Sequence, residues 1–282
     1  MTDSRSKEDP QWSRRRFLAG VGAAGLATSA NLLLSGGAFA DDWGHDNDDR
    51  KRDVTQTILD AAATAEALAS VMYDQMIQSS LYTQYLANNA NDQAYLAAAR
   101  EEESIHYMAL TGAGGNPLTL TFYFPVGMFS TQNGNQSLQT VLNTLITLED
   151  AFIAAYLIGV HDFPHKADRV VAAQILGIES EHRSLGRVIA SDVGLTSVTG
   201  LSGQPESVVA PNHAVNNIAF ERTFSNTGPM LKNIKDVVKL LGPFVTPPSA
   251  GSGFDPTPYT YNTTPNYYLS KNPSVMLDSI TP

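Results

Sequence analysis

Two short motifs pair a carboxylate with an imidazole at the spacing of about one helical turn. Glu103 is followed three residues later by His106, and Glu179 is followed in the same way by His182. Each pair lies in line with apolar residues at helical spacing: Leu96, Ala99 and Leu110 for the first, and Ala172, Ile175, Gly186 and Ile189 for the second. Ionisable side chains are costly to bury without a partner. Both motifs therefore predict that a charge or hydrogen-bond partner for these side chains lies inside the fold.

Two further acidic residues occupy the same kind of apolar face, one on each of two other segments. Glu66 lies among Leu59, Ala62, Ala69 and Tyr73, and Glu149 lies among Leu142, Leu145, Phe152 and Tyr156. Tyr73 and Tyr156 each follow their glutamate by seven residues, or about two helical turns. Each tyrosine is interpreted first as a core aromatic and second as a hydrogen-bond donor to a ligand. Glu102 is expected to point off the ligand face and to be solvated. Asp74 and Asp150 are interpreted first as exposed helix residues and second as supports that hydrogen-bond a ligand.

Four helical segments carry these residues. The first is free of Gly and Pro, the second follows a turn at 88–92, and the fourth follows a turn at Pro164. The segments are 54–88, 94–110, 137–160 and the stretch from the Pro164 turn to about 191. Two hairpins joined by one long crossover, 111–136, predict an all-α four-helix bundle.

The spacing also predicts that the acidic residues meet. In an antiparallel hairpin, facing residues lie equally far from the turn. The midpoint of Glu66 and Glu103 falls at 84.5, close to the first turn, and that of Glu149 and Glu179 falls at Pro164. Four carboxylates in one layer need compensating charge, which two divalent cations would supply, with each histidine giving a neutral nitrogen ligand. The alternative is a metal-free bundle that keeps a buried hydrogen-bond network.

Residues 54–191 resemble the ferritin-like superfamily, in the symmetric form with two Glu-x-x-His helices found in bacterioferritin and rubrerythrin. The resemblance implies a carboxylate-bridged dimetal centre, with Glu103 and Glu179 as bridging ligands. The full implied ligand set is Glu66, Glu103, His106, Glu149, Glu179 and His182. Histidine and carboxylate ligands suit both iron and manganese, and we favour iron.

The N-terminus predicts export. Ser13-Arg14-Arg15-Arg16-Phe17-Leu18 resembles the twin-arginine (Tat) signal S-R-R-x-F-L, and an uncharged run with a cleavage site at Ala38-Phe39-Ala40 follows it. Residues 1–40 are therefore expected to be a signal peptide, and residues 41–53 a charged leader. The Tat translocase would be a partner during export, and the periplasm or extracellular space the destination. The interrupted apolar run does not favour a permanent membrane span.

Composition separates the rest of the chain from the bundle. Eleven of the fifteen prolines follow residue 192, so residues 192–282 are predicted to be an irregular extension with one short helix at 230–241. The chain has no cysteine, which excludes disulfides and thiolate metal sites. Removal of residues 1–40 takes five basic and three acidic side chains from a net charge of −10 and leaves −12, which disfavours nucleic acid as a partner.

These features predict oxidation of Fe(II) with O2 or peroxide. Two alternatives stay open: a dimanganese, catalase-like centre that dismutes peroxide, and a non-enzymatic metal-binding or stress-protection protein of the envelope. The crossover and the extension are too bulky to favour assembly into a ferritin-type iron-storage cage. The oligomeric state is otherwise left open. No sequence signature for an organic substrate is present.

Overall fold

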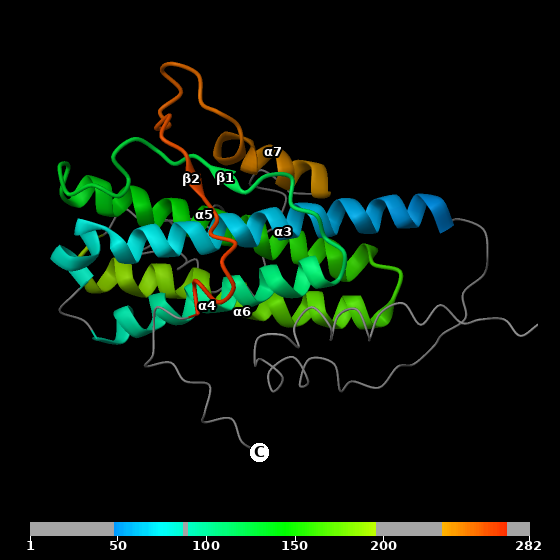
Figure 1. The fold of residues 1–282 in the computed structure, drawn as a ribbon. Coiled ribbons are helices and arrows are strands. Elements are labelled where there is room, and N and C mark those ends of the chain that lie inside the picture. Colours follow the sequence, from blue (N-terminus) through cyan, green and yellow to red (C-terminus); the bar gives the residue numbers. More distant parts are fainter. Residues whose placement is uncertain (1–47, 87–89, 196–232, 270–282) are drawn as a thin grey trace, which may run out of the picture.

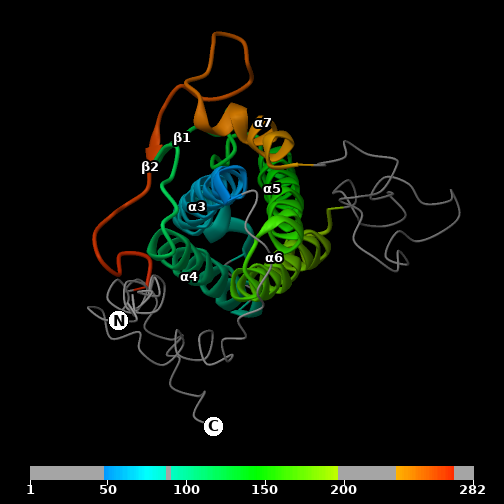
Figure 2. The ribbon, with the colours of Figure 1, turned by 90° about the vertical axis from the view of Figure 1, so that its right-hand side faces the viewer.

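A computed structural model describes residues 48–86, 90–195 and 233–269 (Figure 1). The predicted signal peptide lies outside the described residues. Four long helices form the body of the molecule: α3 (Asp48–Gln78), α4 (Ala90–Gly112), α5 (Asn135–Asp162) and α6 (Lys166–Asp192). Viewed along their axes, α3, α4, α6 and α5 surround a common core in that order (Figure 2). The prediction of an all-α bundle of two hairpins is confirmed.

The first hairpin departs from the prediction at the end of its first helix. The predicted helix over 54–88 stops being α-helical at Gln78 and continues as a π-helical turn, η1 (Tyr82–Leu86). The hydroxyl of Ser79 donates to the carbonyl oxygen of Met76 and accepts from the backbone N–H of Tyr82. This serine therefore takes over a backbone hydrogen bond and interrupts the α-helical ladder.

The second hairpin turns where the sequence predicted. Helix α5 ends at Asp162, Pro164 lies in the connection, and α6 begins at Lys166. The two helices pack closely at Gly186 of α6, where an added Cβ would lie 3.1 Å from Ile146 and 3.2 Å from Leu145 of α5. A larger side chain at Gly186 would push the two helices apart. The glycine thus keeps α6 close to α5 one turn after His182.

The crossover between the hairpins is tied to α3 at its start. Asp60 accepts a hydrogen bond from the backbone N–H of Asn116 at 2.7 Å, and the Thr64 hydroxyl accepts one from Leu118 at 2.9 Å. The crossover then forms strand β1 (Thr121–Phe122), which pairs antiparallel with β2 (Tyr259–Thr260) of the C-terminal extension. This pairing holds the extension against the bundle.

The extension also contributes a short helix that packs on α3 and α5. Helix α7 (Ile234–Val245) lies four residues further along the chain than the predicted 230–241. Asn233 sets its start, because its side chain accepts hydrogen bonds from the backbone N–H groups of Lys235 and Asp236. Helix α7 and strand β2 thus attach the extension to the bundle, and the segment between them loops away from it (Figure 2).

Among the described helices, α5 alone is long and apolar enough to cross a membrane. In its most apolar window, 72% of the residues are buried inside the protein. This apolar character fits its position as a core helix of the bundle.

Candidate metal centre

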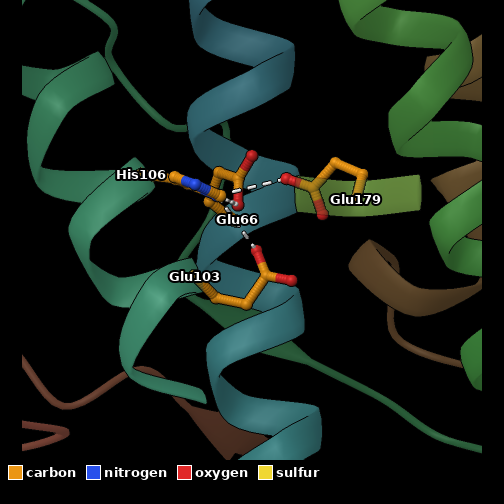
Figure 3. A group of neighbouring side chains, drawn as sticks. All are labelled: Glu66, Glu103, His106 and Glu179. Carbon is orange, nitrogen blue, oxygen red and sulfur yellow. Dashed lines mark ion pairs between the residues drawn. The ribbon is translucent and has the colours of Figure 1, made fainter. Parts of the chain in front are cut away.

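Six ionisable side chains meet in the middle of the bundle. They form two overlapping groups, Glu66–Glu103–His106–Glu179 and Glu103–Glu149–Glu179–His182, and within each group the candidate ligand atoms lie within 4.8 Å of one another. The four glutamates have no exposed surface, and His182 and His106 are 3% and 8% exposed. All six predicted residues are therefore brought together. The four side chains of the first group point toward one another from three helices (Figure 3).

Glu103 and Glu179 belong to both groups, and each divides its two oxygens between the two histidines. His106 Nδ1 lies 3.7 Å from Glu103 Oε2 and 3.1 Å from Glu179 Oε1. His182 Nδ1 lies 2.9 Å from the other oxygen of Glu103 and 3.3 Å from the other oxygen of Glu179. We call the part of the cluster around each histidine a half. A carboxylate with one oxygen in each half has the geometry of a bridge between two cations.

The two remaining glutamates are each held by a tyrosine from the other hairpin. The Tyr73 hydroxyl of α3 donates to Glu149 Oε1 of α5 at 2.7 Å, and the Tyr156 hydroxyl of α5 donates to Glu66 Oε1 of α3. Burial, and then the charge of the bonded glutamate, raises the pKa of each tyrosine well above its usual value, so both stay protonated donors. Both tyrosines are buried in the core and each also donates a hydrogen bond to a predicted ligand, so the two interpretations hold together.

Several buried atoms of the cluster make no hydrogen bond to any residue that the structure describes, although they lie close to one another, and they could hold metal ions. We call Glu66 and Glu149, which each belong to one group only, the lone glutamates. Within the described residues, the buried side-chain atoms without a hydrogen-bond partner include one oxygen of each lone glutamate, oxygens of the two shared glutamates and one histidine nitrogen. In this cluster they are Glu66 Oε2, Glu149 Oε2, both oxygens of Glu103, Glu179 Oε1 and His106 Nδ1. Buried polar atoms are costly unless paired. Oxygen and imidazole donors concentrated in one place are the donors that divalent iron and manganese accept.

Electrostatics shows how the cluster tolerates burial without cations. Burial and the charges of Glu103 and Glu179 raise the pKa of Glu149 well above its usual value, and burial and the same two charges do so for Glu66. Burial alone would lower the pKa of each histidine, but the surrounding carboxylates outweigh it and raise both. These shifts favour the protonated forms of Glu66, Glu149 and the two histidines, and metal binding would displace those protons.

Sequence reasoning missed one neighbour of this cluster. Glu102, expected to be solvated, has a side chain that is 43% exposed, yet its Oε2 lies 2.9 Å from His182 Nε2. Helical spacing places Glu102 beside the ligand face of α4, and it gives no information on a contact with His182 of another helix, α6. Asp74 and Asp150, considered as supports, instead pair with Arg100 at 3.4 Å and Arg183 at 2.7 Å.

Replacement of Tyr73 with phenylalanine should loosen the Glu149 half of the centre. The variant keeps the ring but leaves Glu149 without its hydrogen bond, and bonds to charged groups contribute about 1.5–3 kcal/mol. We expect anaerobic titration with Fe(II) to show one binding step weakened by roughly tenfold or more. Tyr95→Phe, at a position that is 60% exposed, is the matched control and should leave both steps unchanged. Equal titrations of both variants and the parent would contradict the assigned contact.

The arrangement defines a class of protein. Two helical hairpins around a buried layer of four carboxylates and two imidazoles make a ferritin-like bundle whose cluster is compatible with a dimetal site. Residues 55–191 match the family described as the ferritin-like domain, and this part of the chain belongs to the ferritin-like superfamily. No curated protein matches the chain.

Proposed function

We propose that the protein binds two iron ions in a carboxylate-bridged centre and oxidises Fe(II) with O2 or peroxide. The observation that carries the proposal is the division of Glu103 and Glu179 oxygens between His106 and His182. Two divalent cations would balance four carboxylates, and the two histidines would contribute neutral nitrogens. The proposed ligands are the six residues predicted from the sequence, with Glu103 and Glu179 as bridges.

The reaction balances with two Fe(II) ions as the electron donors. Two Fe(II), one O2 and two protons give two Fe(III) and one hydrogen peroxide. With peroxide as oxidant, two Fe(II), one peroxide and two protons give two Fe(III) and two waters. Six protein ligands shared between two ions leave coordination positions for a small oxidant.

The chain contributes position and shielding to this reaction. Tyr73 and Tyr156 orient the lone glutamates so that one oxygen of each stays available to a cation. Apolar side chains on the same helix faces are buried one turn from the glutamates, including Leu145, Phe152 and Ile175. They limit the access of bulk water and favour a small oxidant over an organic substrate.

The experiment is a comparison of iron oxidation with and without the protein. Apoprotein is loaded anaerobically with two Fe(II) per chain and exposed to O2 or to peroxide. We expect ferric absorption in the near ultraviolet to rise faster than in buffer with the same Fe(II). Oxidation no faster than in buffer would overturn the proposal. Rapid O2 release from peroxide after Mn(II) loading would favour the catalase-like alternative, and binding without either activity would favour a non-enzymatic role.

We further propose that the protein is exported by the Tat pathway to the periplasm or the extracellular space. The support is the Arg14-Arg15 pair ahead of an uncharged run and an Ala-x-Ala cleavage site. Export of a folded chain would allow metal loading in the cytoplasm before translocation.

Replacement of Arg14 and Arg15 with lysine should leave precursor in the cytoplasm. The change preserves the positive charge that a general secretion route reads but removes the arginine pair that the Tat signal specifies. Immunoblots of cell fractions give the measurement, and Arg5→Lys, at an arginine outside the motif, is the control. Normal export of the double variant would contradict Tat dependence.

A further inference from the structure

The two halves of the proposed centre differ in what lies behind each histidine. His182 contacts Glu103 and Glu179 through Nδ1, and its other nitrogen, Nε2, lies 2.9 Å from Glu102 Oε2. In the described part of the chain, the contacts of His106 with acidic side chains all use Nδ1. Among the residues that the structure describes, one imidazole is therefore held at both ends by carboxylates, and the other only at the end that faces the cluster.

The difference between the two histidines follows from the residue that precedes each bridging glutamate. Glu102 directly precedes the bridging residue Glu103 on α4, and its side chain reaches across to α6. The residue that directly precedes the other bridge, Glu179, is Ile178, which has no carboxylate to offer. The two Glu-x-x-His helices are thus symmetric in their candidate ligands and asymmetric in the residue beside them.

A carboxylate behind a ligating imidazole has two known effects. It accepts the proton of the outer nitrogen, which fixes the ring tautomer and leaves the inner nitrogen's lone pair for the metal. It also makes the imidazole a better donor, and loss of such a partner costs about 10- to 100-fold in metal affinity. Both effects would act on His182 and not on His106.

We infer that Glu102 is a positioning residue that makes the His182 half of the centre the tighter of two unequal metal sites. The inference rests on the proposed function only in requiring that the cluster binds two divalent ions. It predicts sequential filling, in which the first ion occupies the half formed by Glu149, His182 and the two bridges. The second ion then occupies the half formed by Glu66, His106 and the same bridges.

Metal titration tests this without any measurement of activity. Apoprotein is titrated with Co(II), a redox-stable probe whose visible absorption reports its coordination, and binding is followed by calorimetry and absorption. The parent should show two steps of unequal affinity. Glu102→Gln keeps an oxygen that can accept the hydrogen bond but loses the charge, and Glu102→Ala loses both. The tighter step should weaken about 10- to 100-fold in the alanine variant and less in the glutamine variant.

Two controls separate positioning from a general effect of surface charge. Glu181→Gln removes a charge from an exposed residue next to His182, and it should change neither step. Substitution of the histidines locates the effect: Glu102→Ala should weaken binding in a His106→Ala background and have no further effect in a His182→Ala background. Equal loss in both backgrounds, or no loss from Glu102→Ala, overturns the inference.

The outcomes also separate this inference from the proposed function. Two bound Co(II) ions with Glu102-dependent affinity, in a protein that fails to accelerate Fe(II) oxidation, would overturn the oxidation proposal and support the unequal centre. Accelerated Fe(II) oxidation, with Co(II) affinities that do not change in the Glu102 variants, would support the oxidation proposal and overturn the unequal centre. A parent protein that binds no Co(II) and no Fe(II) overturns both.

Discussion

Replacement of Glu103 with alanine is expected to abolish binding of both metal ions. The carboxylate has one oxygen near His106 and the other near His182, so its loss removes a ligand from each half at once. The remaining residues give each ion one lone glutamate, one histidine and a share of Glu179. Because a bound metal stabilises the native state by mass action, the thermal stabilisation of the parent by added Fe(II) should also disappear.

Metal content after anaerobic loading and melting temperature with and without Fe(II) provide the two readouts. At a free metal concentration one hundred times the dissociation constant, mass action contributes roughly 2.7 kcal/mol per site. Burial would raise the pKa of Glu103, but the hydrogen bond to Glu66 and the contacts with the histidines lower it, so this carboxylate is stabilised in the metal-free protein. The metal-free variant should therefore melt below the metal-free parent, and the readout is the further rise in melting temperature that Fe(II) gives each protein. Glu181→Ala, at an exposed acidic position, should behave like the parent. Two metals per chain in Glu103→Ala would show that the ligand assignment is wrong.

Replacement of Glu149 with alanine should reduce accelerated Fe(II) oxidation to the rate in buffer. Glu149 is the lone carboxylate of the His182 half, so one ion loses a ligand while the Glu66 and His106 half keeps its own. Reduction of O2 to peroxide takes two electrons, which a single Fe(II) cannot supply. The variant should therefore retain up to one bound ion, in the half formed by Glu66 and His106, and lose the rapid reaction.

Stopped-flow absorption after mixing with O2 gives the rate, and anaerobic equilibrium dialysis gives the number of bound ions. The neighbouring residue offers the control: Asp150 pairs with Arg183 outside the cluster, so Asp150→Asn should keep both ions and the rate. Rapid oxidation by Glu149→Ala would place the reaction elsewhere in the protein.

The sequence was sufficient for the bundle and its central layer because both follow from periodicity. Helical spacing placed Glu103 and His106 on one face, and equal distance from the turns placed Glu149 opposite Glu179. A buried face with ionisable residues is rare enough to be informative, since burial of unpaired charge is costly. The predicted helix over 137–160 and the observed α5, Asn135–Asp162, differ by only two residues at each end.

The features that sequence reasoning missed depend on contacts between elements or on one local side chain. Helical spacing within α4 cannot show that Glu102 meets His182 of another helix. The crossed bonds of Tyr73 and Tyr156 likewise depend on how α3 and α5 face each other. The early end of α3 depends on a serine hydroxyl that competes with the backbone, and serine is also common in uninterrupted helices.

The pairing of the extension with the crossover was also beyond the reach of sequence patterns. Strands β1 and β2 are two residues each and lie more than one hundred residues apart in the chain. Segments this short carry no detectable alternation. The composition predicted an irregular extension, and its attachment to the crossover, with Thr121 paired to Thr260 and Phe122 to Tyr259, comes from the structure alone.

The central claim is that two metal ions share Glu103 and Glu179 in the core of the bundle. Anomalous X-ray scattering at the iron edge, from crystals loaded anaerobically with Fe(II), tests it most directly. We expect two peaks about 3.5–4 Å apart, the usual separation in two-metal sites. One should lie among Glu66, His106 and the bridges, and the other among Glu149, His182 and the bridges. A map with a single peak, with no peak in the bundle core, or with iron bound only at the surface would contradict the account.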